Sequence, residues 1–396
     1  MANTLTPTDV YQIVNSVAYQ ATGRTGLTAT DTSSFITVGE TLLRMAPENT
    51  LNALSTVLAK TIFSVRPYRS KLEILNQSNE RWGAMVRKVV PLPKDAEASE
   101  DWNTDLNGTQ LDDGNSVDMY KISKKGAVQL NFYGTKVLQN HITIFRDQLS
   151  LAFTSEAEFS NFIDAIMTDF MNDIETQKES ESRATLLNFM AGMEDMGLTV
   201  VDLVSAYNTK FSDTKTKADL LGPDFEAFVK FFVSEVKTYS EFLTDRSGLY
   251  HANLSALPSP ILRHTPKEKQ RMIMYEPLFI DSQARVLPSI FNPEYLGIGD
   301  YEGVNFWQSK QTPMSISITP NILNVNNGES QTGNAVALDC VVGLLYDIDA
   351  LGVNYQFDYA STTPFNSAGG YFNQYLHGRK NYWNDFTENA VMFVMK

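Results

Sequence analysis

The sequence predicts an α+β protein in which long extended segments alternate with long helices. Three observations support this prediction. Apolar residues repeat at three- and four-residue steps from Phe159 to Ile174, which predicts one long helix with a packed face. Two β-type stretches, Trp82 to Leu92 and Met119 to Tyr133, lie on either side of a polar span and predict a two-stranded ribbon. The third observation is an aromatic, Tyr-rich block from Thr362 to Lys396.

The composition indicates a folded globular protein with an acidic surface. The chain has 396 residues, of which 43% are hydrophobic and 20% are charged, enough for two or three packed modules. The formal net charge of −14 repels phosphate backbones and argues against a basic nucleic-acid-binding face. An acidic protein can still enclose nucleic acid, because repulsion keeps the packaged polymer from sticking to the wall.

Cysteine usage and the N-terminus predict a cytoplasm-like environment. The single cysteine, Cys340, lies in the apolar run from Val336 to Tyr346 and is expected to be a buried hydrophobic residue. One cysteine excludes a disulfide within the chain. Residues 1–9 lack the features of a signal peptide, and no apolar run reaches spanning length, so we expect no membrane association.

The first 75 residues predict a weakly organised arm. Val10, Ile13, Val14 and Val17 have helical spacing, and a Ser/Thr/Gly-rich link follows at residues 22–34. A second amphipathic stretch is expected at residues 50–63. Such segments gain little from their own core, so we expect them to pack on another part of the chain or on a second subunit.

The ribbon has an unusual charge distribution. The span from Asp95 to Asp118 has eight carboxylates and no Lys or Arg, and basic residues flank it on both sides. A two-stranded ribbon cannot bury an apolar face alone, so it must lie on another surface. Its charged ends suit a partner surface of mixed sign. The alternative is a solvated hairpin on the surface of one domain.

The long helix is expected to begin at Ser155, with Glu158 completing a capping box. The polar run from Glu175 to Arg183 should continue this helix with its faces in solvent. A mixed module should follow from Gly192 to Leu344. We expect its helices at 224–243 and 277–287, and strands at 271–275, 304–307, 337–346 and, following the module, 352–359.

No catalytic or metal-binding spacing is present. The four histidines, His141, His251, His264 and His377, lie in separate segments, whereas a zinc site pairs its ligands on one element. Residues 101–105 with Asp112 resemble half of a calcium loop, but position 106 lacks the required glycine. Phosphate-binding glycine loops and a serine nucleophile elbow are also missing. We therefore expect no enzyme activity, no catalytic residues, no metal and no cofactor.

The order of elements resembles the Hong Kong 97 fold of tailed-phage major capsid proteins. The C-terminal segments 363–366, 369–373, 382–386 and 388–394 look like the end of coat proteins from gut phages and short-tailed podophages, and 272–276 resembles their axial strand. The resemblance implies an N-arm at 1–75, an extended β-hairpin loop at 76–135 and a peripheral domain with a spine helix at 136–192. An axial domain at 193–344 and return strands to the peripheral domain at 345–396 complete it.

The resemblance implies a major capsid protein that self-assembles into hexamers and pentamers. These would form an icosahedral-type head around double-stranded DNA, bound without sequence specificity. The implied partners are the chain itself, a portal and scaffolding proteins, and the implied location is the virion, assembled in the host bacterial cytoplasm. Two alternatives remain: an encapsulin-like nanocompartment shell, and an acidic hydrolase with paired carboxylates or bound calcium.

Intersubunit contacts are expected on the ribbon and in the aromatic block, because charged ribbon ends and aromatic side chains are typical of such interfaces. For the aromatic residues, the alternative is that they fill the core of their own subunit. The expected contact residues are Trp82, Arg87, Lys88, Trp102, Asp105, Asp112, Lys121, Lys124, Tyr371 and Trp383.

Overall fold

The protein divides into two compact units, each described here by itself. Unit 1 comprises Met1–Ala84, Gly134–Ala184 and Val353–Tyr382; unit 2 comprises Met85–Tyr133, Thr185–Gly352 and Trp383–Lys396. The computed structural model describes residues 7–23, 26–45, 53, 70–77, 86–94, 104–105, 109–117, 119–120, 122, 124–132, 135–146, 148, 155–285 and 300–396.

Unit 1 contains a four-stranded sheet in the order β1-β13-β14-β4. The strands are β1 (Asn76–Gln77), β13 (Leu351–Thr362), β14 (Tyr371–Asn384) and β4 (Thr135–Phe145). The extended stretch predicted at 352–359 is therefore confirmed. Strands β14 and β4 pair antiparallel over their length, and side chains of β14 alternate between half-buried and buried. This alternation is the pattern of a sheet that packs against other elements on one face.

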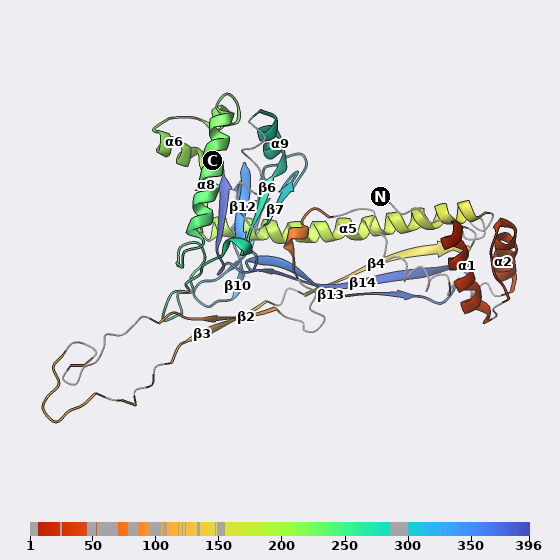
Figure 1. Ribbon diagram of the computed structural model, residues 1–396, viewed down its shortest axis with the longest axis horizontal. Coiled ribbons are helices and arrows are strands. Elements are labelled where there is room, and N and C mark those ends of the chain that lie inside the picture. Colours follow the sequence, from red (N-terminus) through yellow and green to blue (C-terminus); the bar gives the residue numbers. More distant parts are fainter. Residues whose placement is uncertain are drawn as a thin grey trace. The chain divides into compact units, whose positions relative to one another are not determined.

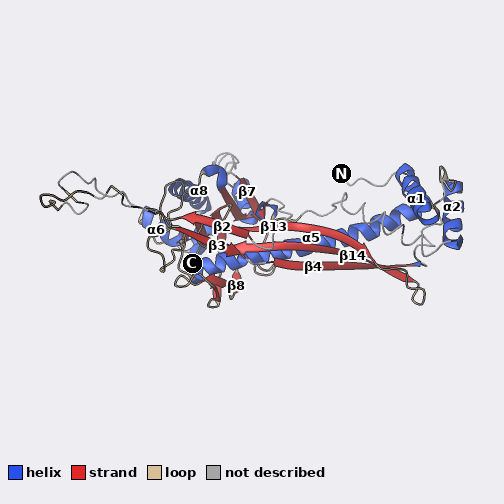
Figure 2. Ribbon diagram, turned by 90° about the horizontal axis from the view of Figure 1, so that it is seen from below, coloured by secondary structure: helices blue, strands red, loops and turns tan. Residues whose placement is uncertain are grey.

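Three helices share a hydrophobic core with the unit 1 sheet. They are α1 (Pro7–Thr22), α2 (Thr32–Met45) and the long α5 (Glu156–Asp195), which runs beside β4 and β14 (Figures 1 and 2). The predicted helix around Val10 to Val17 is confirmed as α1, but α2 begins inside the expected link. The stretch predicted at 50–63 lies outside the described residues except for Ala53. The shared core includes Val10, Val14, Phe35, Leu42, Ile144, Phe159, Phe170, Phe372 and Leu376.

The long helix is confirmed and has 40 residues, but the prediction that its polar run faces solvent is correct only in part, since Thr176 and Ser180 are exposed and other members are buried. Glu175, Ser182 and Arg183 are only 5%, 2% and 8% exposed. Ion pairs along the helix explain how these charges are buried. Glu175 pairs with Lys178 at 3.0 Å, and Arg183 pairs with Glu179 at 2.6 Å. Neutralised in this way, a polar turn can pack against protein.

Unit 2 is built on a five-stranded sheet in the order β5-β15-β12-β6-β7. The strands are β5 (Val200–Asp202), β15 (Ala390–Val394), β12 (Val341–Asp347), β6 (Gln270–Tyr275) and β7 (Asp300–Val304). Every residue of the central β12 is buried, because strands flank it on both edges and helix α8 packs in the same core. Strand β6 confirms the strand predicted at 271–275.

Two strand predictions in unit 2 need correction. The predicted strand at 304–307 ends at Val304, because Trp307 turns into the core and its indole N–H donates to the Val341 carbonyl at 2.8 Å. The strand predicted at 337–346 is broken into β11 (Val336–Leu338), which pairs with β8 (Ile316–Ile318), and β12. Cys340 lies at the break and is buried, as predicted.

The helices of unit 2 are α6 (Leu203–Phe211), α7 (Lys217–Leu221), α8 (Phe225–Phe242) and α9 (Glu276–Arg285). The last two confirm the predicted helices, although residues 286–287 lie outside the described part. The unit also contains the short hairpin β9 (Asn321–Leu323) and β10 (Ser330–Thr332), and single 3-10 turns lie at Glu73–Leu75 in unit 1 and Lys267–Lys269 in unit 2. None of the described helices is both long and apolar enough to cross a bilayer.

The predicted ribbon is confirmed as an antiparallel hairpin in unit 2. Its strands are β2 (Val86–Pro91) and β3 (Ala127–Phe132), with Val86 opposite Phe132 and Pro91 opposite Ala127. Figure 1 shows β2 and β3 side by side. The second strand is shorter than predicted, because β3 begins at Ala127, whereas residues 82–85 of the first predicted strand lie outside the described residues.

Candidate functional site: the root of the β2–β3 hairpin

The hairpin root is fastened first by apolar contacts. Val90 and Leu92 pack on Ile261 in a small buried cluster, and Val128 and Leu130 of β3 pack against it. The Leu92 amide donates to the Gly126 carbonyl at 2.9 Å, which closes the ribbon beyond its last strand pair. A hairpin that projects from its unit depends on such a base, because its own two strands cannot form a core.

Lys88 adds an ionic attachment. On β2 its side chain points to the same face as Val90, while Arg87 and Val89 point to solvent. The Lys88 ammonium lies 2.8 Å from Asp385 Oδ2 and 3.2 Å from Glu388 Oε1, and also donates to the main-chain carbonyl of Asp349. Because both acidic side chains are buried, this pair is shielded from water far more than a surface ion pair.

The acidic partners belong to a tight turn between β14 and β15. Asp385 Oδ1 accepts hydrogen bonds from the Thr387 amide at 2.9 Å and from its hydroxyl at 2.6 Å, the local geometry that Asp favours in turns. Arg263 reaches the turn from another segment. Its Nη2 lies 3.0 Å from Glu388 Oε1, and its Nε donates to the Thr387 carbonyl at 3.0 Å. Glu388 Oε1 thus accepts from two cations.

A second buried polar layer continues from this turn. Asp347, at the end of β12, accepts from the Thr265 hydroxyl at 2.8 Å and from the Asp349 amide at 2.9 Å. The Asn389 amide nitrogen donates to the same Thr265 hydroxyl at 3.2 Å. His251 Nδ1 lies 3.0 Å from Asn389 Oδ1, and its Nε2 lies 2.9 Å from the Ile261 carbonyl. The hairpin root is therefore joined to a continuous hydrogen-bonded network.

The charges in this network perturb one another. Burial raises the pKa of Glu388 to about 7, although Lys88 and Arg263 oppose the shift. Burial also raises the pKa of Asp347. For Lys88, burial acts to lower the pKa, but attraction to Asp385 and Glu388 outweighs it and the pKa is raised. Burial lowers the pKa of His251 and favours its neutral form. The arrangement suits mechanical attachment of the hairpin.

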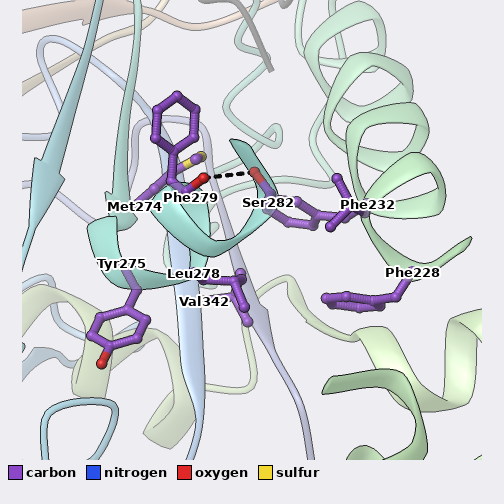
Figure 3. Close-up of a pocket in the computed structure, with 9 residues that line it drawn as sticks. Phe228, Phe232, Met274, Tyr275, Leu278, Phe279, Ser282 and Val342 are labelled. Carbon is purple, nitrogen blue, oxygen red and sulfur yellow. Dashed lines mark hydrogen bonds between the residues drawn. The ribbon is translucent and has the colours of Figure 1, made fainter. Parts of the chain in front are cut away.

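A small pocket in unit 2 offers an alternative site, shown in Figure 3. It lies between α8, α9 and the sheet. Its wall is mainly apolar and includes Phe228, Phe232, Leu278 and Val342. The Ser282 hydroxyl donates to the Phe279 carbonyl at 2.7 Å, so it is occupied within its own helix. The lining contains no carboxylate, whereas the hydrolase alternative requires two that face each other. Among the described residues, no His, Cys, Asp and Glu group could hold a metal ion.

The expected intersubunit contact residues differ in their exposure and in the contacts that they make within the chain. Trp82, Trp102 and Lys121 lie outside the described residues. Arg87, Asp112 and Lys124 are exposed on the hairpin, where Asp105 accepts from the Thr109 amide at 2.7 Å. Lys88 is engaged within the chain, as described above.

The two aromatic candidates differ in exposure. Tyr371 is half-buried at the start of β14, with its ring 5.9 Å from Phe145 in an edge arrangement. Trp383 is buried, at 6% exposed. Their role between subunits stays a prediction.

The other members of the network were not predicted from the sequence. Arg263, Asp347, Asp385 and Glu388 come from three separate segments of the chain. The one available signal was the polar run from Asp385 to Asn389 between two apolar stretches, where buried polar residues need partners. Their partners could not be predicted, because the contacts join residues that lie as far as 297 positions apart in the sequence, as Lys88 and Asp385 do.

The hairpin is thus attached to unit 2 by apolar contacts and by a buried ionic network. A family model described as Phi29-like phage major capsid protein matches residues 13–394. The chain belongs to this family, whose members are structural proteins that assemble into the capsid shell of the virion. The resemblance found in the sequence is confirmed, and the capsid function is favoured over the encapsulin alternative.

Solved capsid structures are similar to this chain. A chain in the capsid structure of Staphylococcus phage Andhra matches with a TM-score of 0.51 and 10% identity, over 83% of this chain and 85% of that one. A chain in the capsid of cyanophage P-SCSP1u matches with a TM-score of 0.47 and 9% identity, over 83% and 89%. The first match confirms the Hong Kong 97-like fold class. No curated protein sequence matches the chain.

Proposed function

We propose that this chain is the main wall subunit of a phage head, forming hexamers and pentamers that close an icosahedral-type shell around double-stranded DNA. The family match over residues 13–394 is the observation that carries the proposal. A closed shell needs the same surfaces to meet repeatedly under symmetry. Segments with no core of their own, such as the hairpin, suit that purpose.

Exposed apolar side chains on the hairpin support the proposal. Met119, Tyr120 and Ile122 are 82%, 80% and 79% exposed. Three large apolar residues so close in sequence form a surface that water solvates poorly, and such surfaces indicate a protein partner. Exposed acidic residues, among them Asp112 and Asp113, lie on the same projecting segment and give the contact a charged rim.

We place the subunit contacts on this hairpin and at the aromatic end of β14. Among the proposed contact residues, Arg87, Asp112 and Lys124 are exposed and directly accessible to a neighbour. Lys88 acts indirectly in this proposal, since it fixes the strand that presents them. The remaining proposed contacts are Trp82, Trp102, Asp105, Lys121, Tyr371 and Trp383.

The proposal includes further partners. A net charge of −14 suits a wall that encloses DNA without binding specific sequences, because phosphate repulsion prevents adhesion. A head that is filled with DNA requires a portal for entry, and scaffolding proteins would guide closure. We propose assembly in the host bacterial cytoplasm, and a structural role without catalysis or a cofactor.

Sedimentation velocity over a range of protein and salt concentrations tests the proposal. The chain should sediment as capsomers or shells. The variant Ile122→Ser should shift the distribution toward subunits, because it removes an exposed apolar contact. Ile280→Ser, which truncates a side chain 55% exposed on α9, is the matched control. Small discrete oligomers under every condition would refute the shell function, and equal effects of the two variants would refute the hairpin contact.

A further inference from the structure

The buried network at the hairpin root has more negative than positive charges. Asp347, Asp385 and Glu388 are 4%, 2% and 8% exposed. Among the residues that the structure describes, two cations, Lys88 and Arg263, reach this group, and their side chains are 17% and 18% exposed. With all five groups ionised, the network would carry one uncompensated negative charge. An uncompensated charge in a buried site is costly, and binding a proton removes that cost.

Within the described part of the chain, the charges that act on Glu388 include no third cation. Asp349 is a further carboxylate, but it is 43% exposed and lies 3.7 Å from the exposed Lys269. His251 is the remaining titratable group beside the network, and its burial favours the neutral form. Thr265, Thr387 and Asn389 contribute only neutral groups. The charges that face Glu388 are therefore Lys88, Arg263, Asp385 and Asp347.

The geometry around Glu388 can accommodate the proton without breaking a contact. Lys88 at 3.2 Å and Arg263 at 3.0 Å both contact the same oxygen, Oε1. A proton on Oε2 leaves Oε1 able to accept from both cations. Asp385 already accepts from Lys88 through Oδ2 and from Thr387 through Oδ1, so both of its oxygens are engaged as acceptors.

We infer that the hairpin root is a proton-dependent fastening: Glu388 holds one exchangeable proton when the root is closed, and loss of this proton weakens the attachment of β2–β3. In the open root Glu388 is solvated and ionises in its ordinary range. The raised pKa of about 7 means that the closed root binds the proton more tightly. The closed state is therefore favoured at low pH. It loses stability as pH rises from the ordinary glutamate range to about 7, and loses no more above that, where Glu388 is ionised in both states.

Because the network is coupled, the proton belongs to the group of carboxylates, and Asp347 is the competing site. Its pKa is also raised by burial. Two features favour Glu388: it contacts two cations through one oxygen, and it directly contacts the hairpin residue Lys88. A fastening controlled in this way would adjust the freedom of the hairpin without any change in its contact surface.

Hydrogen exchange of the β2 and β3 amides tests the inference in the 396-residue chain. It is measured from pH 5.5 to 8.5, corrected for intrinsic exchange, where sedimentation shows a constant oligomeric state. In this test the wild-type sequence and each variant also carry His251→Gln, so protonation of His251 adds no slope. For one linked proton, the opening constant should rise by up to about tenfold per pH unit below about pH 7 and become independent of pH above it. In Glu388→Gln it should be independent of pH.

Matched controls separate Glu388 from other carboxylates. Glu241→Gln, which alters an exposed ion pair with Lys267, should keep the wild-type slope. A flat wild-type profile, or a wild-type slope retained in Glu388→Gln, overturns the inference. Loss of the slope in Asp347→Asn but not in Glu388→Gln overturns the assignment to Glu388.

A measurement without substitutions covers the case in which Glu388→Gln does not fold. Infrared spectra of wild-type protein with isotope-labelled glutamate should show a protonated carboxyl band at pH 6 that disappears by pH 8. Absence of this band at pH 6 overturns the inference. Neither measurement depends on shell formation, so failure of assembly in sedimentation would leave this test unaffected.

Discussion

Replacing Lys88 with methionine should loosen the hairpin while leaving the rest of unit 2 folded. Methionine keeps the length and apolar stem of the side chain and removes only the ammonium group. Asp385 and Glu388 then lose the cation that lies 2.8 Å and 3.2 Å away, and a main-chain carbonyl loses a donor. Arg263 remains as the single positive charge beside three buried carboxylates.

The expected cost follows from the burial of this pair. Removing one partner of a buried ion pair destabilises a protein by about 3–5 kcal/mol. Glu388 can relieve part of the loss by binding a proton, so the lower end, about 3 kcal/mol, is expected for Lys88→Met. At about 1.4 kcal/mol per factor of ten, this corresponds to a hairpin opening constant roughly 150-fold larger.

Hydrogen exchange of the β2 and β3 amides at pH 7 measures this opening constant directly. Arg87→Met is the matched control, because Arg87 lies next in sequence on the same strand with its side chain exposed. It should change the opening free energy by no more than about 0.5 kcal/mol. If the two substitutions had equal effects, the ionic attachment would not be what holds the hairpin.

Three further predictions concern the core of unit 2, each measured by thermal unfolding. Burial lowers the pKa of His251, so the stabilising effect of this residue is present above about pH 6.5 and is lost on acidification. His251→Gln should therefore reduce the difference in stability between pH 7.5 and pH 5.5. An unchanged difference would contradict this role. Gly192→Ala should lower the free energy of unfolding by about 1–3 kcal/mol, because a Cβ there would lie 2.5 Å from the Phe386 ring. In the control Gly26→Ala, the added Cβ meets nothing within 4 Å, so the free energy of unfolding should hardly change. Trp307→Phe removes a buried donor to β12 and should cost about 1–2 kcal/mol; no loss would show that this bond is dispensable.

Local patterns predicted most of the elements. The stripe from Phe159 to Ile174 predicted α5, because regular apolar spacing defines a helix face whatever it packs against. The polar turns after Ile174 were misjudged in part, for a related reason. Sequence spacing shows that Glu175 and Arg183 are polar, but it does not show that ion pairs along the helix allow them to be buried.

Strand boundaries were less predictable, because they depend on pairing partners that are distant in the sequence. The apolar run from Val336 to Tyr346 looks continuous, yet its two halves pair with different strands. The hairpin was predictable from its flanking β-type stretches. Its attachment was not, since Lys88 meets Asp385 and Glu388 only after the C-terminal strands have been placed in unit 2.

Electron microscopy of the purified chain tests the central claim most directly. A phage head subunit should appear as closed, roughly isometric shells, or as rings of five and six copies that close when concentrated. Particles no larger than small discrete oligomers at every protein and salt concentration would contradict the assignment of this chain as a self-assembling wall subunit.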